Sequence, residues 1–194
     1  MAHIIVLGAG LGGTIMAFEM KDQLRAGDQL TVLNKGAHYS FVPSNPWVAV
    51  GWRDKEEIEV DLRDVFKKHD IGFNASGAKR VHPDTNEIEL LDGTTLHYDY
   101  LIISTGPELA FDEIEGLGPD HHTASICHVD HALHAREVVS TLIKKGGPVI
   151  IGAAQGASCY GPAYEFAFIL ETELRRQKVR DKVPMMFVTP EPYI

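Results

Sequence analysis

A glycine-rich turn near the amino terminus constrains the fold of this chain more than any other feature. Gly8, Gly10 and Gly13 occupy the positions of a G-x-G-x-x-G pattern, between an apolar run and a segment of helical periodicity at about 12–26. In that pattern the first glycine allows a tight turn, the second lets the backbone approach a pyrophosphate, and the third lets the helix pack close to the strand. The sequence therefore predicts a strand–turn–helix unit that binds a nucleotide at the start of its helix.

The identity of the nucleotide depends on two further positions. The next predicted strand, 29–34, ends at Asn34, where dinucleotide sites usually carry an acidic residue that binds the ribose hydroxyls. The carboxamide of Asn34 can also hydrogen-bond hydroxyls, so the turn alone does not distinguish NAD from FAD. Thr105-Gly106, after another apolar run, resembles the Thr-Gly step that returns the chain to the cofactor in FAD-dependent pyridine nucleotide-disulfide reductases. Together with the turn, this step favours FAD.

A second strand–turn–helix pattern begins at about residue 148, but its turn is altered. Ala154 and Ala157 stand where the second and third glycines belong, which argues against an NADH site. Cys159 lies near the start of the following predicted helix, 159–177. A helix amino terminus stabilises a nucleophilic thiolate, whereas a free cysteine is just as often a buried packing residue. Position alone leaves both interpretations of Cys159 open.

The other cysteine, Cys127, lies beside His128 and close to His131. Imidazoles can move protons and raise the thiolate character of a neighbouring cysteine. The two histidines are three residues apart and would share one face of a helix. A zinc site that combined them with both cysteines is weakly supported, because the spacing matches no usual zinc pattern. We predict no metal site, and two cysteines in 194 residues do not make a disulfide scaffold.

The order of the predicted elements indicates an α/β fold with two Rossmann-like units. We expect residues 1–110 to form the FAD-binding domain, in which a β-rich insertion at 71–104 adds a β-meander to a parallel sheet in three layers. A long loop is expected at about 35–55. Residues 111–194 are expected to form an incomplete second Rossmann-like domain, with a helix at 129–145, and the end of the chain just after a strand indicates truncation. The first helix is expected to face inward through its large apolar residues, which are Ile15, Met16, Phe18, Met20 and Leu24.

The net charge and the lengths of the apolar runs limit the classes of binding partner and the cellular location that we expect for the protein. The net charge of −9 argues against a nucleic-acid partner, because binding phosphates requires a lysine- and arginine-rich surface. No run reaches the roughly 18 apolar residues that a membrane-spanning helix needs. The chain begins directly in a predicted strand, so we expect cytoplasmic synthesis without a signal peptide. The sequence leaves homo-oligomerisation open.

Two motifs are far more specific than the glycine turn. The letters PSNPW occupy residues 43–47, and CYGPAYE occupies residues 159–165. Three further segments, at 98–107, 125–131 and the amino terminus, match the same group of proteins. Over essentially all 194 residues the chain resembles the amino-terminal part of sulfide:quinone oxidoreductases.

The resemblance implies a peripheral membrane flavoenzyme that oxidises sulfide to sulfane sulfur and passes two electrons through FAD to quinone. Cys159 matches one member of a redox cysteine pair whose partner would lie beyond residue 194. Cys127 matches a third cysteine near the flavin, which is linked to the FAD ring in some members. His131 and Glu165 match positions near the sulfur site and would assist proton transfer. Sulfide would attack the oxidised pair and leave a persulfide.

The resemblance also extends the predicted cofactor site. Val42, Pro43 and Ala78 match segments that contact FAD in the family. The complete set of expected FAD-binding residues is Gly8, Gly10, Gly13, Asn34, Val42, Pro43, Ala78, Thr105 and Gly106. We expect this chain alone to bind FAD weakly and to lack quinone reductase activity.

Three alternatives stay open at this point. A type II NADH:quinone oxidoreductase has the same fold but would need a working second glycine motif. The flavin subunit of a sulfide dehydrogenase that reduces cytochrome c is exported, and this amino terminus carries no export signal. A non-catalytic nucleotide-binding module would be short by nature.

Overall fold

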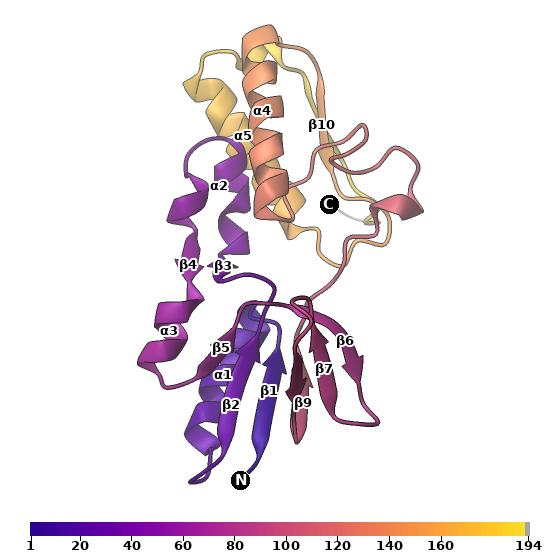
Figure 1. The fold of residues 1–194 in the computed structure, drawn as a ribbon. Coiled ribbons are helices and arrows are strands. Elements are labelled where there is room, and N and C mark those ends of the chain that lie inside the picture. The colour runs from indigo at the N-terminus through magenta and orange to yellow at the C-terminus, as the bar shows by residue number, and fades with distance from the viewer. Residues whose placement is uncertain (193–194) are drawn as a thin grey trace. The chain divides into compact units, whose positions relative to one another are not determined.

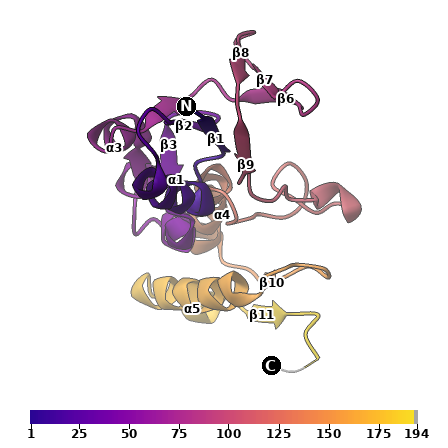
Figure 2. The same ribbon diagram turned by 90° about the horizontal axis from the view of Figure 1, so that it is seen from below.

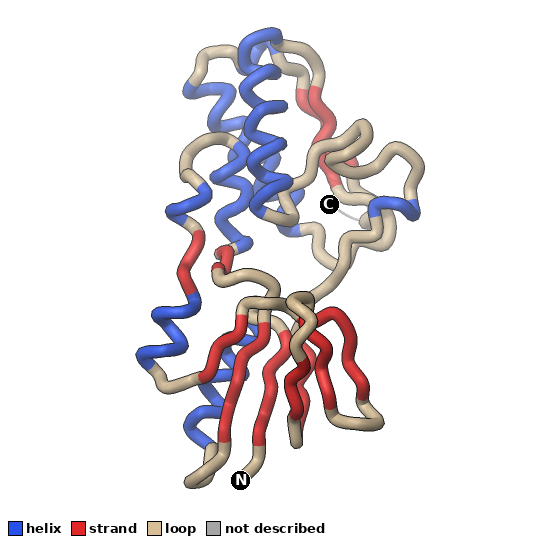
Figure 3. The backbone as a smooth tube through the Cα atoms, viewed as in Figure 1, coloured by secondary structure: helices blue, strands red, loops and turns tan. Residues whose placement is uncertain are grey.

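The computed structural model describes residues 1–192; the last two residues, on which the expected chain end falls, lie outside the described part. The chain divides into two compact units. Unit 1 comprises Met1–Ser40 and Glu59–Leu109, and unit 2 comprises Phe41–Ile58 and Ala110–Ile194. The division differs from the expected one because the segment 41–58 belongs to unit 2. Unit 1 is rich in strands and unit 2 in helices (Figure 3).

Unit 1 is built around a parallel sheet of four strands in the order β5-β2-β1-β9 (Figure 1). In that order the strands are Gly72–Asn74, Gln29–Leu33, His3–Leu7 and Tyr100–Ile103. β1 pairs with β2 from His3 opposite Gln29 onward, and with β9 from Ile4 opposite Tyr100. Residues 4–7 are all buried, as the apolar run predicts for a central strand covered on both faces.

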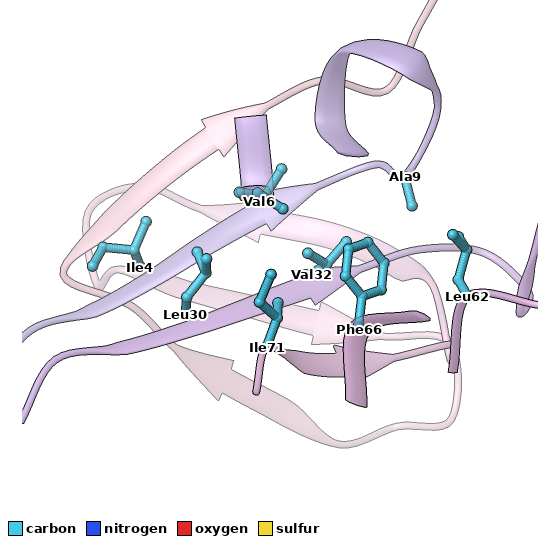
Figure 4. Close-up of a cluster of buried hydrophobic side chains, with 9 residues drawn as sticks. Ile4, Val6, Ala9, Leu30, Val32, Leu62, Phe66 and Ile71 are labelled. Carbon is cyan, nitrogen blue, oxygen red and sulfur yellow. The ribbon is translucent and has the colours of Figure 1, made fainter. Parts of the chain in front are cut away.

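Two different layers cover the faces of this sheet. On one face, α1 (Leu11–Gln23) and α3 (Leu62–Lys68) pack over alternate strand residues such as Val6 and Val32 (Figure 4). On the other face, Ile5 and Leu33 pack against an antiparallel sheet. Its strands are β6 (Ala78–His82), β7 (Glu87–Leu90) and β8 (Thr95–His97). The predicted α/β fold with three layers, including the β-meander, is therefore confirmed.

The inward face of α1 differs from the prediction. Ile15 and Met16 are exposed, and the helix residues buried against the sheet are Gly13 and Ala17. Small residues at these positions let the helix axis approach the strands closely, so larger apolar side chains are displaced to its flanks and outer side. Phe18, with Met20 and Leu24, packs at the edge of the core as expected.

The segment expected as a long loop at 35–55 instead forms short ordered elements. β3 (His38–Ser40) pairs antiparallel with β4 (Glu59–Asp61) in unit 1. A 3-10 turn (Val42–Ser44) and α2 (Asn45–Ala49) then follow in unit 2. The apolar residues of α2 pack against α4. These tertiary contacts order a segment that its prolines alone would predict to be irregular.

Unit 2 combines α2 with two long helices and a two-stranded parallel sheet. α4 spans Val129–Lys145, as predicted, and ends at Gly146, whose φ of 69° places it in the left-handed region that glycine favours. β10 (Val149–Gly152) pairs with β11 (Met185–Val188), and α5 (Gly161–Arg176) runs beside both strands (Figure 2). Further 3-10 turns span Lys55–Glu57, Phe111–Glu113 and Arg180–Lys182.

Polar side chains fasten the segment 41–58 inside unit 2. Arg136 of α4 donates to the carbonyl of Val48 at 2.8 Å and to that of Arg53, and its guanidinium lies 2.8 Å from an Asp54 carboxylate oxygen. The indole Nε1 of Trp52 donates to the buried carboxylate of Glu173 at 2.6 Å. This segment is therefore an integral part of unit 2.

Candidate functional site

The glycine turn of unit 1 is shaped by close backbone contacts. Gly8 has a φ of 102°, and a Cβ atom there would lie 2.3 Å from the carbonyl oxygen of Ser104. A Cβ atom on Gly13 would lie 1.9 Å from the carbonyl oxygen of Gly8. Real Cβ atoms do not approach oxygens this closely, so both positions require glycine for the turn itself to form.

Gly10 has a different role from the other two glycines. It precedes α1 with a φ of −69°, a value that any residue adopts, and a Cβ atom there would meet nothing within 4 Å. Within residues 1–192, no side chain caps the amino terminus of α1, and its first turn has no acidic residue. The first N–H groups of the helix therefore have no side-chain acceptor, which is the arrangement that accepts a diphosphate.

Asn34 fixes the turn from the end of β2. Its Oδ1 accepts a hydrogen bond from the Ala9 N–H at 3.0 Å, and its Nδ2 donates to the Gly36 carbonyl at 3.1 Å. The side chain thus links the end of β2 to the glycine turn. Its expected contact with a ribose hydroxyl stays a prediction.

The other expected cofactor residues are divided between the two units. In unit 1, the exposed residues Thr105 and Gly106 follow β9, whose end packs on the glycine turn through Ser104. Ala78 is half-buried at the first position of β6. In unit 2, Val42 and Pro43 are exposed in the 3-10 turn before α2.

Cys159 lies at the amino-terminal end of α5. Its thiol is free and exposed, and its Sγ lies 3.9 Å from the place of a Cβ atom on Gly161, the first residue of the helix. No side chain in the described part of the chain caps this helix end. The exposed position excludes the buried packing role that the sequence left open. Glu165, one turn into α5, is also exposed.

A hydrogen-bond network joins the first turns of α5 to the end of β11. The hydroxyls of Tyr164 and Thr189 both donate to Oε2 of Glu191 at 2.8 Å. This hydrogen bond to the carboxylate raises the pKa of Tyr164. The ring of Tyr164 also packs on Phe187, with centroids 4.5 Å apart. Tyr164 belongs to the CYGPAYE motif, but the sequence alone indicates no role for it.

Cys127 lies in the segment that leads into α4. Its thiol is free and exposed, and the preceding carbonyl, that of Ile126, accepts a hydrogen bond from Asn45 Nδ2 at 3.0 Å. His131 lies in the first turn of α4, with its ring between those of Phe111 and His128, at centroid distances of 5.7 and 5.2 Å. Among the described residues, no hydrogen bond joins Cys127, Cys159, His131 and Glu165 to one another.

Two buried polar atoms of unit 2 have no hydrogen-bond partner in the described part of the chain. One belongs to a residue that bonds to the carbonyl just before Cys127, and the other to a residue four positions after Cys127. They are Oδ1 of Asn45 and Nδ1 of His131. An unsatisfied buried polar group costs roughly 1–3 kcal/mol of stability. Sequence reasoning missed Asn45 as a candidate, although its place between two prolines in the PSNPW motif was the available signal.

His131 gives unit 2 a pH dependence that can be measured. Burial and the neighbouring charge of His128 lower the pKa of His131 below its ordinary value of 6.5. The unfolded chain then binds a proton that the folded chain does not, so this contribution to stability is complete above about pH 6.5 and falls as pH decreases towards the folded-state pKa. We expect thermal unfolding at a lower temperature at pH 5.5 than at pH 7.5, and His131→Phe to reduce that difference. The exposed His134, changed to Gln, is the control; an equal reduction by both variants would contradict the assignment.

Within residues 1–192, no group of three or more His, Cys, Asp or Glu side chains is placed to hold a metal ion. The helices of the same part of the chain are too short or too polar to cross a membrane.

The match to a family model decides the classification. The family described as pyridine nucleotide-disulphide oxidoreductase matches residues 2–157, which is more than half of the chain. The chain belongs to the pyridine nucleotide-disulphide oxidoreductase family. The matched residues include the glycine turn, the Thr105-Gly106 step and Cys127. Proteins of this family depend on FAD, in agreement with the nucleotide predicted from the sequence.

Individual relatives within the family extend the match along the chain. The sulfide-quinone reductase of Aquifex aeolicus is 39% identical over 192 residues, which are 99% of this chain and 44% of that protein. The mitochondrial sulfide:quinone oxidoreductase of Dictyostelium discoideum is 24% identical, with coverage of 96% of this chain and 42% of its own length. The chain thus spans less than half the length of these relatives.

Solved structures agree with the sequence relatives. The crystal structure of the sulfide:quinone oxidoreductase from Aquifex aeolicus has a TM-score of 0.91 at 37% identity and covers 100% of this chain and 44% of that chain. The structure of NDH2 from Plasmodium falciparum in complex with NADH has a TM-score of 0.70 at 17% identity, with coverages of 96% and 41%. The second likeness is one of fold alone.

Proposed function

We propose that this chain is the FAD- and thiol-bearing part of a sulfide:quinone oxidoreductase. The observation that carries the proposal is the 39% identity to a sulfide-quinone reductase along 99% of the chain. The family model ends at residue 157, before Cys159, whereas this similarity also includes the segment with Cys159 at the start of α5. The sulfur chemistry is therefore supported by a part of the sequence separate from the nucleotide turn.

The residues of unit 1 fit FAD. The open space at Gly10 and the uncapped start of α1 accept a diphosphate, and Gly8 and Gly13 give the turn its shape. Thr105 and Gly106, at the end of β9, would face the same cofactor. Ala78 is a further proposed contact in unit 1, and the contacts expected from the resemblance at Val42 and Pro43 stay predictions. When bound, FAD supplies a two-electron acceptor that can pass electrons on to a quinone.

The thiols of unit 2 would carry the sulfur. Hydrosulfide attacks one sulfur of an oxidised cysteine pair that includes Cys159; the S–S bond breaks, a persulfide forms on one cysteine and the other leaves as a thiolate. Cys159 lies just before the amino terminus of α5, where its exposed thiol is accessible to hydrosulfide. Glu165 and His131 would take up or return protons, and Cys127 would lie beside the flavin.

The second glycine turn keeps only the first of its three glycines, and strand packing requires that glycine, as it requires Gly8 in the first turn. A Cβ atom on Gly152 would lie 2.0 Å from the carbonyl oxygen of Val188, so this glycine is needed for β10 to pair with β11. Ala154 and Ala157 replace the other two glycines. The type II NADH:quinone oxidoreductase alternative is therefore less well supported. Quinone as the electron acceptor and a peripheral position on the membrane surface are part of the proposal.

A test of the proposal compares two reductants on the flavin. We expect the purified chain, with FAD in excess, to quench flavin fluorescence on binding. In the full-length protein, which would supply the second cysteine of the pair, sulfide should bleach the bound flavin without oxygen and NADH should not, because the second glycine turn is altered. Cys159→Ser should slow bleaching by sulfide about tenfold or more, since it removes the nucleophile. Free FAD is the control for direct reduction. Bleaching by NADH but not by sulfide would overturn the proposal.

A further inference from the structure

Asn45 makes a contact that links two distant parts of unit 2. Its side chain is fully buried at the first position of α2, and its Nδ2 donates to the carbonyl of Ile126 at 3.0 Å. Ile126 immediately precedes Cys127. Only the nitrogen of the carboxamide can donate to a carbonyl, so this contact fixes the orientation of the group. The Oδ1 atom is then left without a partner among the described residues.

We propose that Asn45 is a positioning residue that holds the backbone of the Cys127 segment. The proposal rests on the proposed role of Cys127 beside the flavin, because positioning has a consequence for the reaction only if that thiol takes part. Asn45 buries one amide oxygen without a partner, which a leucine of similar volume would not do, but a leucine would leave the Ile126 carbonyl without its donor. The hydrogen bond to Ile126 is what an asparagine provides here and a leucine does not.

The support beneath Asn45 is rigid enough to act as an anchor. Val48 and Ala49, on the same short helix, are fully buried against Ala132 and Ala135 of α4. The guanidinium of Arg136 holds the carbonyl of Val48 at 2.8 Å. Asn45 therefore projects from an element that is fixed by packing and by a charged hydrogen bond.

Apart from the bond to Asn45, the segment before α4 is held mainly by the packing of the Ile126 side chain against the cluster of α2 and α4. Residues 121–124 are exposed, and Cys127 is exposed with its N–H hydrogen-bonded to the Ser125 hydroxyl at 3.2 Å. The residue before α4, His128, makes no side-chain cap within the described part of the chain. Loss of the Asn45 contact should thus release the backbone around Cys127 locally and leave α4 in place.

The experiment measures the alkylation rates of both cysteines in one chain. Iodoacetamide is added at pH 8, and labelling of the peptides that contain Cys127 and Cys159 is followed by mass spectrometry. We expect Asn45→Leu and Asn45→Ala to raise the rate of Cys127 relative to Cys159 about threefold or more, because a freed backbone lets the exposed thiol adopt more of the orientations in which it can attack. Cys159 lies in the same unit and reports any general loosening, and Asn45→Ala removes the same hydrogen bond without added volume if Asn45→Leu does not fold.

Val48→Ala is the matched control. It shortens a fully buried side chain of the cluster against which Ile126 packs, and it leaves the hydrogen bond from Asn45 to the Ile126 carbonyl in place. A rise in the Cys127 to Cys159 ratio with both Asn45 variants, but not with Val48→Ala, supports the proposal. An unchanged ratio in the Asn45 variants, or an equal rise with Val48→Ala, overturns it. The assay needs neither FAD nor sulfide, so its outcome is independent of the flavin-bleaching test of the proposed function.

Discussion

Replacing Gly13 by alanine is expected to unfold unit 1 under conditions in which the unchanged chain is folded. The new Cβ atom would lie 1.9 Å from the Gly8 carbonyl oxygen, so either α1 or the glycine turn must move. Both are part of the packing over β1 and β2, and overpacking against fixed backbone costs at least about 3 kcal/mol. Urea unfolding followed by circular dichroism should show the loss, with a midpoint well below that of the unchanged chain.

Gly10→Ala is the control for this expectation, and it separates folding from binding. Its Cβ atom would meet nothing within 4 Å, and the φ of −69° suits alanine. We expect the urea midpoint to stay nearly unchanged, whereas quenching of FAD fluorescence should be lost, because the methyl group occupies the space where a diphosphate approaches. Equal loss of stability in the Gly10 and Gly13 variants would show that the turn is not packed as described.

Arg136→Met is expected to lower the stability of unit 2 by about 2 to 4 kcal/mol, through two carbonyls that lose their donor. The guanidinium donates to the backbone carbonyls of Val48 and Arg53 and pairs with the Asp54 carboxylate. One side chain therefore bonds to both the end of α2 and the turn after it. Methionine keeps the apolar length of the side chain but donates no hydrogen bond. Thermal unfolding should shift downward by roughly 10 °C.

Arg175→Met is the matched control in the same unit. Arg175 pairs with Glu171 one turn earlier on α5, and its side chain is 71% exposed. Exposed pairs of this kind contribute little to stability. A fall in unfolding temperature as large as that of Arg136→Met would mean that the loss of any arginine, rather than of the bonds to α2, explains the effect.

The parts of the fold that the sequence predicts well are those with strong local signals. α4 has glycine at its end and lysines in its last turn, and its bounds agree with the predicted 129–145. The glycine turn and the buried strand before it are equally local. The inward face of α1 was predicted wrongly at Ile15 and Met16, because close helix–strand approach favours small residues over large apolar ones.

Hydrogen bonds between residues far apart in the sequence are the part of the site that sequence patterns do not predict. The contact from Asn45 to Ile126 spans 81 positions, and that from Trp52 to Glu173 spans 121. Neither pair has a periodicity or spacing that a single sequence displays. Asn34 illustrates a second difficulty, since its carboxamide already bonds to the backbone of Ala9 and Gly36, and the residue type alone did not indicate this.

The membership of residues 41–58 in unit 2 has a consequence for any attempt to separate the two halves. The backbone passes between the units three times, after Ser40, after Ile58 and after Leu109. Cleavage at one of these points leaves two covalent links, and a fragment that starts at residue 110 lacks α2 and the partners of Arg136. Each unit must therefore assemble from segments that are not contiguous in the chain. During synthesis, residues 41–58 of unit 2 are made before the 51 residues of unit 1 that separate them from the rest of unit 2.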